Sequence, residues 1–520
     1  MQRMNRITAV GRATLLMAAT AALAAAQGGA GVPPAGGQVI ELSLERMVQL
    51  AMDNSYQIRR LNLEVERTSH RLRAELAGLK SRVDLEMSIP AYELISESRW
   101  NSSLQRYEIT RENSRRWEAE LSVSQPVVLF GYPTNGRLSL NNRVYRYTQL
   151  EEEGNTTLQY YNRYYIAYEQ PLFQPNGLKN DLEEARLDLE RAQLDFQDDV
   201  VELIDDVAGE YFELFESAYQ ARIREANLAR LEKAMAAATT VIGSDSTRAI
   251  EADQIRVETA NARERLQQVR SSFRLRAASA KQQLRLAPTD SLVLNPVAEV
   301  TPVLIDVDEA IRFGMELTPR FRQLDIRLRE DEIRLANTKG RNSFRMDLEL
   351  SYGREMQVQD RAFSNLWESP SNSYTLGVNA FLPIWDWGER RAEIAAAEVG
   401  IRSARLSIEE ARSEIVSNVR NEVRNVEEYQ NRVLTMQENL NLAGNVSETS
   451  LNAYRAGSIS AVDLLRSFQR ESETAENLLE AYLGWREALL SLQELTFFDY
   501  ERRVPIVERF GIRGGTPLGG

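Results

Sequence analysis

Two long segments of the chain carry apolar residues at intervals of seven positions. In residues 388–454, which contain no proline, these positions include Ile401, Ile408, Ile415, Val419, Val426, Val433 and Leu440. In residues 178–240 they include Leu182, Leu189, Phe196 and Leu203. A sustained seven-residue period is typical of helices that supercoil against neighbours. At about 1.5 Å per residue, each helix is expected to be on the order of 100 Å long. Shorter helices are expected at residues 43–80, 249–287, 306–340 and 459–496.

Other segments alternate between apolar and polar residues with a period of two. Residues 83–89 and 346–352 place large apolar groups on one face and mainly carboxylates on the other. This pattern suits strands in a barrel wall between lipid and water. A returning strand in each half passes through a proline and a glycine into the long helix; these junction residues are Pro171, Gly177, Pro383 and Gly388. Tyrosine and tryptophan crowd the junctions, as they do at bilayer interfaces.

The chain repeats itself. A shift of 263 positions, without a gap, places Met52 on Met315 and Arg59 on Arg322, and the match tightens where residues 82–88 fall on residues 345–351. Each copy is one unit of helix, strand and long helix. The repeat divides the chain into a first copy at residues 42–300 and a second copy at residues 301–497, and two copies suggest pseudo-symmetry around an axis.

Residues 97–160 interrupt the first copy. Two further strand-like runs, residues 117–128 and 137–147, flank the turn-forming residues 131–136. The insertion is expected either to form an extracellular hairpin, which is the favoured interpretation, or to add two strands per chain. The second alternative would make eighteen strands in a trimer.

The two ends of the chain differ in character. Residues 1–26 combine a basic start with an alanine-rich apolar run and small residues before Gln27, the pattern of a secretory signal peptide. Residues 27–41 are expected to be a flexible lead-in rich in glycine and proline, and residues 498–520 a C-terminal tail. Beyond the signal, no stretch is apolar enough for a membrane helix, so entry into a membrane would require a β-barrel.

The amino-acid composition argues against several kinds of partner, catalytic site and metal site. The formal charge of −13 argues against a nucleic-acid partner. The chain has no cysteine and a single histidine, His70, in the middle of a helical stretch. Thiolate sites are therefore excluded, and a metal or Ser/His site would have to rely on one imidazole. We expect no enzyme activity, no cofactor and no metal site.

One chain offers too few strands to close a barrel, since about eight are needed and open edges are not tolerated in lipid. Oligomerisation is expected to supply the rest, and four strands per chain would give twelve in a trimer. A rod-like coiled coil without a lumen would explain the helices but not the strands.

Three signatures, in order, resemble the TolC-like outer-membrane efflux proteins from about Leu42 to Thr496. Each copy opens with a short amphipathic helix, at residues 44–52 and 307–315. The second strand of each copy ends in a family-like turn, at residues 170–177 and 382–388. The most specific signature, residues 454–465, resembles the turn at the periplasmic tip, where Gly457 suits a left-handed backbone and Ser458 or Ser460 can cap the returning helix.

The resemblance implies a mainly α-helical fold with a β-barrel and two structural repeats per chain. A trimeric outer-membrane β-barrel would continue into a long periplasmic α-helical coiled-coil barrel. The implied function is a passive duct of a tripartite efflux or type I secretion system in the outer membrane, with a large periplasmic portion. The implied partners are two further copies of the chain, outer-membrane lipid, a periplasmic adaptor, and an inner-membrane efflux pump or ABC exporter. The alternative is a periplasmic coiled-coil adaptor or scaffold without a pore.

The resemblance also implies a gate at the tips. Tyr454 matches a gate tyrosine and Asp463 matches the first acid of the family's constriction, but Arg466 stands where a second acid is usual, and Ile459 replaces a gate arginine. Rings of Asp463 and Arg466 would pair rather than repel. The other interpretation of Asp463 is a solvated acid in the first turn of a helix.

In the first copy, the tip falls near residues 243–247. Either Glu251 or Asp253 is expected to take the acidic position there. Adaptor contacts are expected at the small residues of the tips, which are Gly243, Ser244, Gly457 and Ser458.

Overall fold

The computed structural model describes residues 39–101, 105–150, 156–241, 246–341, 343–359, 362–368 and 370–512. Its helices are α1 (Leu44–Asn54), α2 (Tyr56–Gly78), α3 (Gly177–Val241), α4 (Ser246–Gln283), α5 (Val307–Glu316), α6 (Pro319–Arg341), α7 (Glu389–Arg455), α8 (Ala461–Thr496) and α9 (Ile506–Arg509), with a 3-10 helix at Phe363–Trp367. Its longer strands are β2 (Arg82–Asn101), β3 (Arg106–Leu129), β4 (Tyr132–Leu150), β5 (Thr156–Leu172), β7 (Arg345–Gln359) and β8 (Ser371–Phe381). The short strands are β1 (Val39–Glu41), β6 (Ser291–Val293), β9 (Phe498–Asp499) and β10 (Val504–Pro505).

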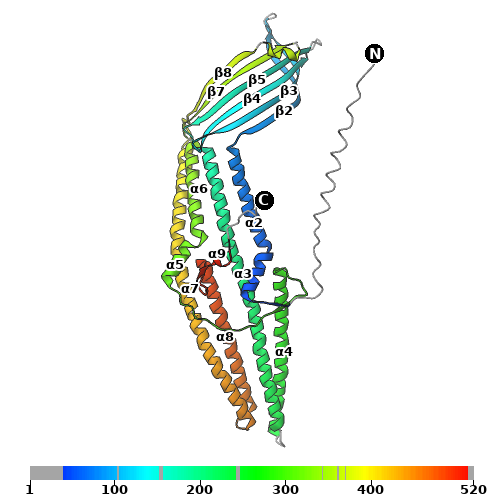
Figure 1. Cartoon of the computed structure of the whole chain (residues 1–520), viewed down its shortest axis with the longest axis vertical. Helices are drawn as coiled ribbons and strands as arrows, with labels where there is room; N and C mark the ends of the chain where they lie inside the picture. Colours follow the sequence, from blue (N-terminus) through cyan, green and yellow to red (C-terminus); the bar gives the residue numbers. More distant parts are fainter. Residues whose placement is uncertain are drawn as a thin grey trace, which may run out of the picture.

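The molecule is elongated, with a twisted sheet at one end and long helices extending from it (Figure 1). Helices α3 and α4 form one hairpin, and α7 and α8 form another. Both hairpins turn at the end far from the sheet, so their tips lie close to each other (Figure 1). Helices α2 and α6 fill the space beside α3 and α7 next to the sheet.

The internal repeat is confirmed in the secondary structure. Strand β2 begins at Arg82 and β7 begins at Arg345, the same offset of 263 positions found in the sequence. The helices expected at residues 43–80 and 306–340 are each broken in two, and the breaks are equivalent. Ser55 has an extended backbone, and its hydroxyl accepts a hydrogen bond from the Gln57 amide at 3.0 Å, so it caps α2. In the second copy Pro319 begins α6, and a proline disfavours helical geometry in the residue before it.

The large sheet has six strands in the order β2-β3-β4-β5-β7-β8, and every neighbouring pair is antiparallel. The favoured expectation, that the insertion at residues 97–160 forms a hairpin outside the wall, is therefore wrong for β3 and β4. These strands lie between β2 and β5 and pair with both of them. The reason is that the insertion continues the alternation of its neighbours for long enough to hydrogen-bond along both edges.

The seven-residue pattern in α7 is confirmed as a packing surface. Val419, Val426 and Val433 are buried against Trp485 and Leu492 of α8 in the largest apolar cluster. Among the described residues, no helix combines the length and the apolar character needed to cross a membrane.

Two small structural units pack against the helices in the middle of the molecule. Strands β1 and β6 pair in parallel and join the start of the first copy to its end. The residues after α8 fold back rather than forming a plain tail: β9, β10 and α9 pack Ile506 and Ile512 against Val65 and Val200. Arg502 and Arg509 form ion pairs with Glu45 of α1, at 3.0 and 3.4 Å.

Candidate functional site

The six-stranded sheet has one apolar face and one polar face. Residues that pair directly across strands share a face, and successive residues alternate between faces. One row of paired residues is Val83, Val123, Leu140, Ile166, Tyr352 and Tyr374. The adjacent row is Arg82, Ser124, Ser139, Ala167, Ser351 and Thr375. The apolar row runs unbroken across all six strands, which is the surface that lipid requires.

Charged and hydroxyl side chains cover the polar face. Glu118 of β3 forms ion pairs with Arg116, at 3.0 Å, and with Arg143 of β4. Ser122 donates a hydrogen bond to Asn141 across the same pair of strands at 2.6 Å. Such side chains suit contact with water rather than with acyl chains.

The expected junction residues lie where the strands meet the helices. Pro171 is near the end of β5 and Gly177 is the first residue of α3. Pro383 lies between β8 and α7, and Gly388 has a φ of 88°, a left-handed conformation that suits glycine.

Aromatic side chains project from this end of the sheet. Phe130, in the turn between β3 and β4, is fully exposed, and Trp387 is 90% exposed. The rings of Trp385 and Trp387 meet edge to face with their centroids 5.5 Å apart. Exposed aromatic side chains of this kind are the feature expected at a bilayer interface.

The tip between α7 and α8 has the geometry expected from its sequence. Gly457 has a φ of 74°. The Gly457 amide donates a hydrogen bond to the Tyr454 carbonyl at 2.9 Å, and the Ser458 amide donates one to the Ala453 carbonyl at 2.9 Å. This double closure is a Schellman motif. Of the two serines considered as caps, Ser460 is the one that accepts from the Asp463 amide, at 3.2 Å.

The gate candidates are divided between the hairpin core and its surface. Tyr454 is buried in an apolar cluster that includes Leu464 of its own hairpin and Leu231 of the other. Asp463 is exposed and accepts a hydrogen bond from the Ser460 hydroxyl at 2.8 Å, in the first turn of α8. No ion pair joins Asp463 to Arg466 in the described part of the chain. Through this bond Asp463 supports Ser460, the N-cap residue of α8.

In the first hairpin, Gly243 and Ser244 lie outside the described residues. Glu251 is half-buried on α4. Asp253 is exposed and pairs with Arg256 at 2.7 Å. Asp253 and Arg466 also line opposite sides of one groove, so the structure brings these two candidates to the same place.

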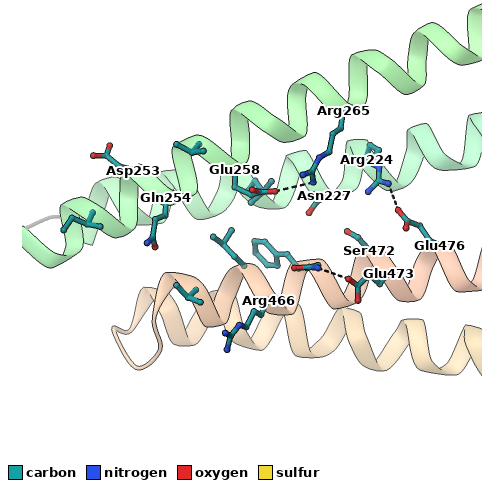
Figure 2. Close-up of a pocket in the computed structure, with 17 residues that line it drawn as sticks. Arg224, Asn227, Asp253, Gln254, Glu258, Arg265, Arg466, Ser472, Glu473 and Glu476 are labelled. Atoms are coloured by element: carbon teal, nitrogen blue, oxygen red, sulfur yellow. Dashed lines mark hydrogen bonds and ion pairs between the residues drawn. The ribbon is translucent and has the colours of Figure 1, made fainter.

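This groove separates α4 from α8 near the tips and has a volume of about 810 Å³ (Figure 2). We call it the inter-hairpin groove. Ile250, Val257, Val462 and Leu465 supply apolar patches, and charged side chains lie around them. Arg224 of α3 reaches Glu476 of α8 at 2.6 Å, along one side of the groove (Figure 2).

A second ion pair joins the hairpins more deeply. Arg230 of α3 pairs with Glu471 of α8, and the Glu471 side chain is only 7% exposed. Its other carboxylate oxygen, Oε2, is buried without a hydrogen-bond partner in the structure. The sequence analysis missed this pair because its members are 241 positions apart and neither belongs to a recognisable motif.

Half-buried acids line α3 closer to the sheet. Burial raises the pKa of Asp198 and of Asp205, and neighbouring carboxylates add to both effects. The carboxylates that add to the raised pKa of Asp205 are those of Asp206 on its own helix and Glu487 on α8. No group of His, Asp or Glu side chains among the described residues has the arrangement of a metal site.

Comparison with known proteins identifies the same architecture. Residues 327–496 match the family described as outer membrane efflux protein. The solved structure of CusC is 14% identical, covering 89% of this chain and 94% of CusC, with a TM-score of 0.60. The outer membrane protein VceC of Vibrio cholerae is 12% identical over 87% of this chain and 95% of its own, with a TM-score of 0.62. The CmeC outer membrane channel of Campylobacter jejuni is 11% identical over 91% of this chain and 89% of its own, also with a TM-score of 0.62.

No curated protein matches the chain in sequence. The low identities to the solved channels are evidence of a shared fold, and the family match supplies the relationship in sequence. Both agree with the amphipathic sheet and the paired helical hairpins. Residues 327–496 thus match the outer membrane efflux protein family, and the chain as a whole shares the fold of the solved outer-membrane proteins CusC, VceC and CmeC.

Proposed function

We propose that the protein is the outer-membrane duct of a tripartite efflux or type I secretion system. The observation that carries this proposal is the continuity between an amphipathic sheet and two long helical hairpins. The sheet offers one face to lipid and one to water, and the hairpins extend far enough to reach into the periplasm. Transport through the proposed duct is passive, as the family resemblance implies, and its energy comes from the inner-membrane pump.

The working assembly is a homotrimer. The outer edges of β2 and β8 have no strand partner among the described residues, and open strand edges are not stable in lipid. Copies of the same chain provide matching edges. The helices of the three copies then continue the wall as an α-helical barrel, as the family resemblance implies.

The tips of the hairpins are the docking point for a periplasmic adaptor, which connects the duct to an inner-membrane pump or ABC exporter. Small residues allow close helix approach, so Gly457 and Ser458, with Gly243 and Ser244 of the other hairpin, are the proposed contacts. The proposed gate includes Tyr454, Asp463 and Arg466, with Glu251 and Asp253 from the first hairpin.

The test is a measurement of conductance in planar bilayers, together with the mass of the purified full-length protein in detergent. A trimer that forms discrete conducting channels is expected. A monomer without pores, or a protein that fractionates with the soluble periplasm, would instead favour a coiled-coil adaptor or scaffold.

The gate assignment has its own test. If Asp463 lines the narrowest point, Asp463→Ala changes conductance or its blockade by polyvalent cations. Unchanged behaviour, with a trimer of normal mass, would limit Asp463 to capping α8.

A further inference from the structure

We infer that the outer-membrane wall of this protein contains eighteen strands, six from each of three copies, with β8 of one copy paired to β2 of the next. The inference rests on the proposed trimeric duct and adds its width and the surface by which copies join. The two strands of the insertion, β3 and β4, are part of the wall.

The first support is the continuity of the apolar face through β3 and β4. Val123 and Leu140 lie between Val83 of β2 and Ile166 of β5 in one row of paired residues. Leu140 and Ile166 are about equally exposed in the single chain, at 52% and 51%. Through this pairing, Val123 and Leu140 extend the lipid-facing surface of β2 and β5 across β3 and β4.

The second support is the direction of the edge strands. The sheet contains an even number of antiparallel strands, so β2 runs away from the helices and β8 runs back toward them. The free edge of β8 is therefore antiparallel to the free edge of β2 in the next copy. A ring of copies closes with the same pairing throughout, as barrels in the outer membrane require.

The third support is the stagger of the strands. The row that begins at Arg82, the first residue of β2, crosses five pairings and reaches Thr375 of β8. Strand β8 continues for six residues beyond Thr375, to Phe381, before it leaves for α7. Six residues span about 20 Å along a strand and five spacings span about 24 Å across the sheet, which gives a tilt on the order of 40°. Membrane barrels have strand tilts of about 35–45°.

The number of strands, their spacing and their tilt together determine the diameter of the barrel. With a spacing of about 4.8 Å and a tilt of about 40°, eighteen strands close at a backbone diameter on the order of 36 Å, and twelve strands close at roughly 24 Å. Barrels of about 16–18 strands leave an open aqueous channel. The proposed barrel is thus wider than one built from four strands per chain. The size of the cargo is therefore limited at the helical tips and not in the barrel.

The test uses the absence of natural cysteine, which makes any introduced thiol unique. Full-length variants Leu140→Cys, Ile166→Cys and Ser139→Cys are treated in intact outer membranes with a charged maleimide. Leu140→Cys in β4 is expected to resist labelling, as is Ile166→Cys in β5, because both face lipid. Ser139→Cys, its neighbour on the polar face, is expected to react. All three should react after denaturation, which controls for expression.

Labelling of Leu140→Cys as strong as that of Ser139→Cys, with Ile166→Cys still protected, would overturn the inference. A count of strands in cryo-electron microscopy maps of the unmodified trimer gives an independent answer. Eighteen strands support the inference. A trimer with twelve strands refutes it and leaves the proposed duct intact, whereas the absence of any trimer or pore removes both.

Discussion

The ion pair between Arg230 and Glu471 offers a direct test of how the two hairpins are held together. The change is Glu471→Gln, which keeps the shape of the side chain and removes its charge. It leaves the guanidinium of Arg230 without its carboxylate partner at the junction of α3 and α8. The pair lies alongside the inter-hairpin groove, whose lining includes Leu231 and Ser472, and a small separation of the helices there would be amplified toward the tips.

The expected magnitude follows from burial. Removing one partner of a fully buried ion pair costs about 3–5 kcal/mol, and an exposed pair is worth about 0–1 kcal/mol. The Glu471 side chain is 7% exposed and that of Arg230 is 28% exposed, so the pair lies between these limits. We expect a cost on the order of 2 kcal/mol, which shifts the equilibrium between joined and separated hairpins about 30-fold.

The assay is single-channel conductance, with thermal stability of the detergent-solubilised protein as a second readout. Glu471→Gln should increase the time spent in conducting states and lower the melting temperature. The matched control is Glu480→Gln, because Glu480 pairs with Arg432 inside the second hairpin and its side chain is 70% exposed. If the two variants behave alike, the buried pair does not hold the hairpins together and the reasoning from burial is refuted.

Three further outcomes are expected. Burial raises the pKa of Asp205, so the folded protein binds a proton at this carboxylate more readily than the unfolded chain does. The ionised carboxylate therefore destabilises the folded protein at high pH, and this cost disappears as the pH falls through the raised pKa. Asp205→Asn should raise the melting temperature at pH 7.5 more than at pH 5, and an equal rise at both would contradict this. Gly340→Ala would drive a Cβ into the Pro175 ring and should destabilise the protein by about 1–3 kcal/mol in thermal melts. Gly400→Ala, whose Cβ meets nothing closer than 4.0 Å, should be neutral or stabilising in the same assay. Ser460→Ala removes the cap of α8 and should cost about 1 kcal/mol in the same assay, with no loss of stability counting against the capping geometry.

The sequence was most informative where a pattern is local. The shift of 263 positions located the starts of β2 and β7, and the seven-residue period located the buried face of α7. Gly457 was identified as a left-handed residue because a tight turn between long helices has few other solutions.

The sequence was least informative where the outcome depends on distant pairing. The alternation in β3 and β4 is equally compatible with a separate hairpin and with a wall, and only the hydrogen-bonded register to β2 and β5 decides between them. Strands β1 and β6 have three residues each, which is too short for any periodicity to be seen. The pair of Arg230 and Glu471 depends on how two hairpins lean together, which no local signal records.

The contact between the two ends of the chain affects how the protein matures. Glu45 lies in the first helix, yet its cationic partners Arg502 and Arg509 are among the last residues that the structure describes. Contacts that join such remote positions slow folding, because a long loop must be ordered before they form. The opening helix therefore cannot acquire its final neighbours until almost the whole polypeptide has been delivered, so truncation at the C-terminus should leave the beginning of the chain unfinished as well.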